Sequence, residues 1–129
     1  MTVHYTITGN LFRLHMEGNY TPEDIIETYN AALKDPRLPK DARFIFDVSK
    51  SEEMATRETA VIKSIARYFA EHSDIVGRRC AILAVKPVHF GLSRMAATVA
   101  ELRGAEVRVF NNEADAISWL NSDVETETD

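Results

Sequence analysis

The sequence predicts an α/β fold built as a single domain. Four apolar runs, residues 11–16, 44–48, 80–85 and 107–110, alternate with amphipathic stretches along the 129-residue chain. Near-continuous apolar runs are typical of strands buried within a sheet, and the amphipathic stretches between them predict helices that cover it. The expected order is β-β-α-β-α-β-α-β-α, a mixed, mostly parallel sheet of about five strands that begins with an antiparallel hairpin.

The hairpin is predicted by two alternating segments, residues 3–8 and 11–16. Gly9-Asn10 between them is a tight-turn signal, so the two strands are expected to pair antiparallel. His4 and His15 fall on facing strands of this hairpin and are candidates for cross-strand neighbours. Because no cysteine or third ligand was identified beside these two imidazoles, the sequence predicts no metal site.

The first helix is predicted to begin at Thr21-Pro22, where a hydroxyl cap, a proline and two acids follow one another. Its buried face should contain an apolar set with helical spacing, namely Ile25, Ile26, Tyr29, Ala32 and Leu33. The prolines at 36 and 39 end it.

The remaining elements follow in alternation. They are a strand at 43–48 with a polar loop at 49–53, a helix at about 55–73, a strand at 79–85, a helix at 92–103, a strand at 105–110 and a last helix capped by Asn112.

Composition and charge indicate how the chain is organised and which class of partner is not expected. Residues 1–121 are expected to form the domain, and residues 122–129 a disordered acidic tail. The formal net charge is -5, and the four acids of that tail account for all but one of these charges. Because the basic residues are scattered among acids, nucleic-acid binding is not expected.

The single cysteine, Cys80, lies in an apolar run and is expected to be a small buried residue rather than a nucleophile. The chain shows neither a basic leader nor an apolar segment of membrane-spanning length, so a soluble cytoplasmic protein without an integral membrane segment is expected.

Several segments carry a resemblance to a known family. They are the opening hairpin, the strand end Phe46-Asp47-Val48-Ser49, residues 79–84, His89-Phe90-Gly91, and the last strand and helix from residue 107 to 120. In this pattern the chain resembles the STAS-like, or SpoIIAA-like, family of small bacterial α/β domains, and more distantly the CRAL-TRIO lipid-binding domains. The resemblance implies a SpoIIAA-like fold over about residues 1–121 and a regulatory or ligand-binding role.

The resemblance does not extend to the phosphorylation motif of the anti-sigma-factor antagonists. Those proteins carry an Asp-Ser-Ser-Gly-like segment after the Asp-Leu-Ser strand end, whereas this chain reads Met54-Ala55-Thr56-Arg57-Glu58. Thr56 can in principle accept a phosphate, but its neighbours are typical of an exposed first helical turn.

A binding site is expected at the carboxyl ends of the strands, where ligands of open α/β sheets usually lie. Basic and polar side chains near the start of a helix can attract an anion, and the distant lipid-binding resemblance suggests an apolar pocket. The candidate ligand-binding residues are Asp47, Ser49, Lys50, Lys86, His89, Phe90, Ser93 and Arg94. The structural alternative for Asp47 is an Asx turn that holds the following backbone.

The predicted function is a non-catalytic regulatory or ligand-binding module of the STAS-like type, without a cofactor. Its partner would be a protein or an apolar or anionic small molecule, bound at the strand-end loops. The alternative is a small hydrolase or transferase using Asp47, Ser49 and His89, which requires a serine hydroxyl within hydrogen-bonding reach of the histidine. A homodimer formed through the hairpin edge or the second helix is a third hypothesis.

Overall fold

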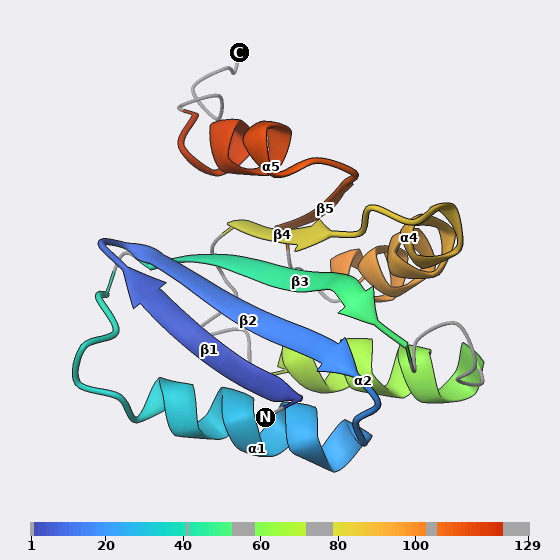
Figure 1. The fold of residues 1–129 in the computed structure, drawn as a ribbon, viewed down its shortest axis with the longest axis horizontal. Helices are drawn as coiled ribbons and strands as arrows, with labels where there is room; N and C mark the ends of the chain where they lie inside the picture. The colour runs from blue at the N-terminus through green and yellow to red at the C-terminus, as the bar shows by residue number, and fades with distance from the viewer. Residues whose placement is uncertain (1, 41, 53–58, 72–78, 103–105, 123–129) are drawn as a thin grey trace.

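The element order agrees with the prediction from the sequence. The computed structural model describes residues 2–40, 42–52, 59–71, 79–102 and 106–122. The elements are β1 (Val3–Thr8), β2 (Leu11–Gly18), α1 (Pro22–Leu33), β3 (Arg43–Ser51), α2 (Thr59–Glu71), β4 (Arg79–Leu83), α4 (Pro87–Glu101), β5 (Glu106–Phe110) and α5 (Glu113–Leu120). The strands form one five-stranded sheet in the order β1-β2-β3-β4-β5 (Figure 1). β1 is antiparallel to β2, and the other pairs are parallel, which confirms the predicted class.

The hairpin forms as predicted because Gly9 adopts the left-handed backbone conformation that the turn requires. Its φ is 60°, and the turn is closed by the pairing of Thr8 with Leu11. The same register pairs His4 with His15, so the two histidines are cross-strand neighbours.

Helix α1 begins at the predicted cap. The Thr21 hydroxyl accepts a hydrogen bond from the Asp24 backbone N–H at 3.1 Å, and the Asp24 carboxylate accepts one from the Thr21 N–H at 2.9 Å. This reciprocal capping box satisfies two helix-end donors. Ile25, Tyr29 and Ala32 are buried as expected, whereas Ile26 and Leu33 are only half-buried.

Helices cover the two faces of the sheet unequally. The larger core lies on the face covered by α1, α2 and α4 and includes Phe12, Leu14 and Phe44. A smaller core on the other face packs Ala116 and Leu120 of α5 against β3 and β4. Figure 1 shows α5 on one side of the sheet and α1 with α2 on the other. Helix α5 packs mainly on β3, β4 and β5, and it reaches the hairpin through Leu11 and through the ion pair between Arg13 and Glu113.

Several predicted boundaries are wrong. Strand β2 continues to Gly18 instead of ending at residue 16, and β4 ends at Leu83 instead of residue 85. Strand β3 continues to Ser51 instead of ending at residue 48, because its pairing with β2 resumes after a register shift and joins Glu17 to Lys50 and Gly18 to Ser51. Helix α4 begins at Pro87 rather than at residue 92, because proline is well suited to the first helical position.

Other predictions fall partly or wholly outside the described residues. These concern both ends of the second helix, including Thr56, and residues 123–129 of the acidic tail.

Candidate functional site at the carboxyl edge of the sheet

The carboxyl ends of three parallel strands meet at one edge, as the site prediction requires. Asp47 on β3 is in register with Leu83 on β4, and Leu83 is in register with Phe110 on β5. The segments that follow β4 and β5 therefore leave the sheet at the same edge. The tertiary structure then decides which side chains are exposed there.

Asp47 and Ser49 bond to each other. The Ser49 backbone N–H donates to Asp47 Oδ1 at 3.0 Å, and the Ser49 hydroxyl donates to the same oxygen. The Asp47 carboxylate thus binds the backbone N–H two residues further along the chain. This contact agrees with the structural alternative for Asp47, an Asx turn. Asp47 lies in strand β3 as predicted, whereas Ser49 also belongs to this strand, so the predicted polar loop is wrong at this position.

His89 and Ser93 are buried on helix α4. Their exposed fractions are 2% and 0%, so neither presents its side chain to solvent. Burial lowers the pKa of His89, the nearby Lys86 cation lowers it further, and a hydrogen bond to the Val48 backbone opposes both effects. The imidazole therefore favours its neutral form, and its bond to Val48 ties the first turn of α4 to β3.

The geometry does not supply the contact that the enzyme alternative requires. His89 Nδ1 is buried and has no hydrogen-bond partner, while the Ser49 hydroxyl is used by Asp47. Among the described residues, Ser49 and His89 are therefore not joined by a hydrogen bond. A general base must be within hydrogen-bonding reach of the proton that it takes.

The exposed part of the edge is basic and apolar. Lys50, Lys86 and Arg94 are exposed, and Phe90 is half-buried against the larger core. Val85 and Val88, on either side of Lys86-Pro87, are 54% and 51% exposed. The segment from residue 85 to 88 is thus accessible throughout, which sequence reasoning missed because Val85 was assigned to a buried strand.

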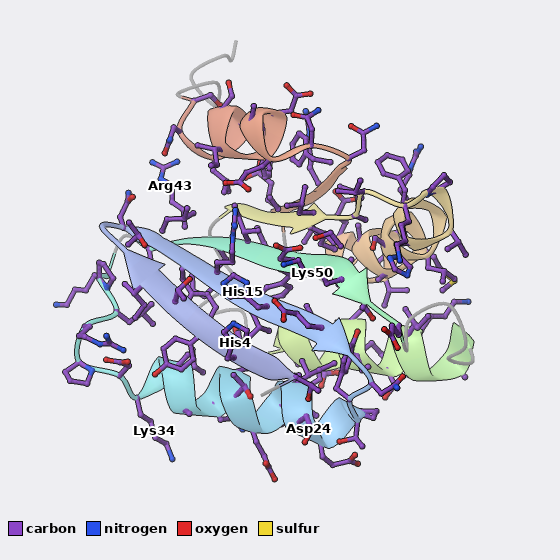
Figure 2. The ribbon with its side chains drawn as sticks, in the orientation of Figure 1. His4, His15, Asp24, Lys34, Arg43 and Lys50 are labelled. Carbon is purple, nitrogen blue, oxygen red and sulfur yellow. The ribbon has the colours of Figure 1, made fainter. Side chains whose placement is uncertain are left out.

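A second group of side chains lies on the sheet face that carries α5. His4, His15 and Glu17 each offer a potential ligand atom, and these atoms all lie within 4.8 Å of one another. Figure 2 shows His4 and His15 on adjacent strands, with Lys50 farther along β3. Sequence reasoning found the histidines but missed Glu17, although His15-Met16-Glu17 is the strand spacing that places two side chains on one face.

Comparison with known proteins supports the family assignment. A crystal structure of an uncharacterised DUF3478-family protein with a SpoIIAA-like fold, from Shewanella loihica PV-4, is similar with a TM-score of 0.55 at 16% identity. The similarity covers 92% of this chain and 91% of that one. A search of curated proteins gave no match. Within the described residues, no helix combines the length and apolar character needed to cross a membrane. A model of the SpoIIAA-like family matches residues 11–121, and the chain therefore belongs to the SpoIIAA-like family.

Proposed function

We propose that this protein is a non-catalytic binding module that contacts a protein partner through residues 85–88 at the carboxyl edge of the sheet. The observation that carries the proposal is the exposure of Val85 and Val88, both more than half accessible, on either side of the exposed Lys86. Exposed apolar groups gathered in one segment are typical of interaction surfaces.

The exposure of residues 85–88 favours a protein partner over a small-molecule ligand. A small-molecule site is concave and covers most of its ligand, so its lining side chains are themselves largely covered. Val85 and Val88 project into solvent instead. The segment that carries the two valines is held in place because His89 and Ser93, which follow it in α4, are buried. A rigid segment loses little conformational entropy when it binds.

Charge indicates the chemistry of the partner. Lys50, Lys86 and Arg94 are exposed and belong to the segments around this edge, so a partner surface with acidic side chains around an apolar centre would be complementary. Cytoplasmic localisation is part of the same proposal.

The test is site-specific photo-crosslinking in the host cell. A photoreactive amino acid replaces Val88 in one variant and Leu102 in the control, because Leu102 is also apolar and is 79% exposed, and it follows the far end of the same helix. We expect a discrete adduct with one protein at position 88, and its loss when Lys86→Glu is added. An adduct of equal yield at position 102, or none at 88, would contradict the proposal.

Native mass spectrometry of the purified protein distinguishes a small-molecule ligand from a protein partner. A stoichiometric metabolite or lipid on the wild-type chain, retained in Lys86→Glu and accompanied by no protein adduct, would count against the protein partner.

A further inference from the structure

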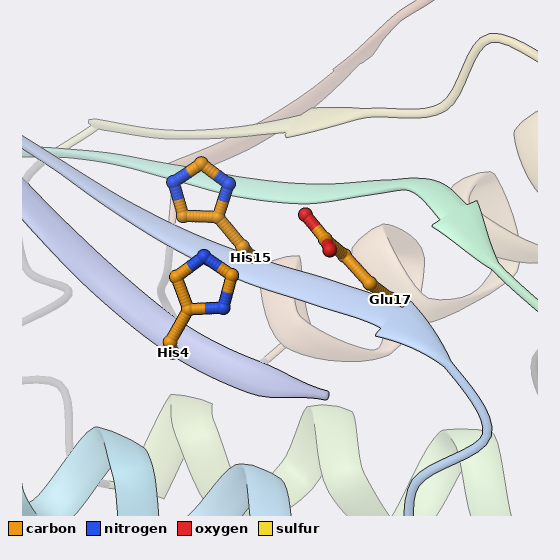
Figure 3. A group of neighbouring side chains, drawn as sticks. All are labelled: His4, His15 and Glu17. Carbon is orange, nitrogen blue, oxygen red and sulfur yellow. The ribbon is translucent and has the colours of Figure 1, made fainter. Parts of the chain in front are cut away.

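The hairpin face opposite α1 brings three metal-ligating side chains together. His4 comes from β1, and His15 and Glu17 come from β2. The register pairs His4 directly with His15, and Glu17 is two residues further along the same strand, which puts it on the same face. Figure 3 shows the two imidazoles one over the other with the Glu17 carboxylate beside His15. We propose that His4, His15 and Glu17 form a binding site for a divalent first-row transition metal ion such as Zn²⁺.

The donor set fits this class of ion. Two imidazole nitrogens and one carboxylate oxygen make a three-ligand protein site that leaves a further position for water or an external ligand. Imidazole suits Zn, Cu, Fe and Ni, whereas Mg and Ca prefer sites made of oxygen alone. The potential ligand atoms lie within 4.8 Å of one another, and all three residues are half-buried and thus accessible to an ion.

The hydrogen-bonding state of the histidines is compatible with metal binding. Thr6 Oγ1 lies 3.2 Å from Nε2 of His15, which leaves Nδ1 of that ring available. A partner on the second ring nitrogen is the arrangement that orients metal-bound histidines. His4 Nδ1 is buried and has no hydrogen-bond partner. The rings are stacked, with centroids 4.5 Å apart and planes 4° apart. Binding therefore requires the rings to tilt so that their in-plane lone pairs converge.

Both acidic and basic side chains lie near the three proposed ligands. Asp47 lies across from His15 in the register of β2 with β3, and its carboxylate accepts hydrogen bonds from Ser49. Two basic side chains lie nearby: the Arg13 guanidinium is paired with Glu113 at 3.0 Å, and Lys50, which is in register with Glu17, is exposed to solvent.

The first experiment is titration of the full chain with Zn²⁺ by calorimetry after treatment with a chelator. We expect one ion per chain. Because Glu17→Gln and His4→Gln each remove a direct ligand, each should weaken the affinity by more than the roughly 10–100-fold typical for loss of an outer partner. Glu27→Gln, a matched change at an exposed position of α1, should bind as the wild type does.

Co²⁺ serves as a spectroscopic probe of the same site. We expect visible absorption bands of a Co²⁺ ion with nitrogen and oxygen ligands in the wild type and in Glu27→Gln, and their loss in His15→Gln. Circular dichroism confirms that each variant is folded. Absence of Zn²⁺ binding, or equal affinity in the wild type and both ligand variants, would overturn the site. Since the crosslinking at position 88 does not use these residues, either proposal can fail without the other.

Discussion

At the scale of single residues, burial determines the chemistry of Cys80. The side chain is buried in the larger core, and burial raises the pKa of its thiol to about 12. Because the thiolate is the reactive form, we expect no reaction of the native protein with a thiol reagent at pH 8, and one thiol per chain after unfolding in urea. Rapid labelling of the folded protein would contradict this assignment. The sequence predicted a buried, unreactive cysteine on the same physical ground.

The Asp35 carboxylate makes the stability of the folded protein depend on pH. Its carboxylate accepts hydrogen bonds from the Tyr5 hydroxyl at 2.6 Å and from the Arg37 side chain at 2.8 and 3.1 Å. The Arg37 bonds, followed by the Tyr5 bond, hold the pKa of Asp35 well below its usual range. Because the pKa is lower in the folded state than in the unfolded state, the stabilisation is present above the unfolded pKa and is lost as the pH falls toward the folded pKa.

Urea unfolding of Asp35→Asn and of the wild type across a pH series tests this linkage. We expect the variant to have the lower midpoint at pH 7 and the difference to shrink below about pH 4, where the unfolded carboxyl takes up its proton. A difference that is constant with pH would show that the carboxylate charge is not the cause.

At the scale of elements, two glycines offer a matched comparison. Gly9 in the hairpin turn has a φ of 60°, whereas Gly91 in α4 is not among the glycines with positive φ. A Cβ added at either position would meet nothing within 4 Å, so steric clash does not separate them. The difference between the two positions is therefore their backbone conformation.

Gly9→Ala should lower the free energy of unfolding by about 1–2 kcal/mol, because alanine is disfavoured in the left-handed region. Gly91→Ala should raise it by about 0.4–1 kcal/mol, because alanine reduces the entropy of the unfolded chain and suits a helix. Chemical denaturation of both variants measures the two values. Destabilisation of similar size at both positions would be inconsistent with this account.

At the scale of the whole molecule, the two cores share one sheet. Ile45, Ala81 and Leu83 belong to the smaller core with α5, while their strand neighbours Phe44, Phe46 and Ile82 belong to the larger one. A strand cannot leave one core and remain ordered in the other, so we expect both to unfold together.

The single tryptophan offers a test of whether the two cores unfold together. Trp119 packs against the smaller core, and its ring is 5.7 Å from that of Phe110. Its fluorescence and the far-ultraviolet circular dichroism should therefore follow the same urea transition. An earlier fluorescence transition would mean that α5 separates from the sheet before the larger core unfolds.

The amino-acid sequence by itself determined the α/β class, the hairpin at Gly9-Asn10 and the capped start of α1, because apolar periodicity and turn and cap residues act over a few neighbouring positions. It also placed His4 opposite His15. Only the tertiary structure decided that His89 and Ser93 are buried, that residues 85–88 are exposed, and that the ligand atoms of His4, His15 and Glu17 lie within 4.8 Å of one another. Exposure and proximity depend on how separate elements pack, and that packing arises from contacts between residues far apart in the chain.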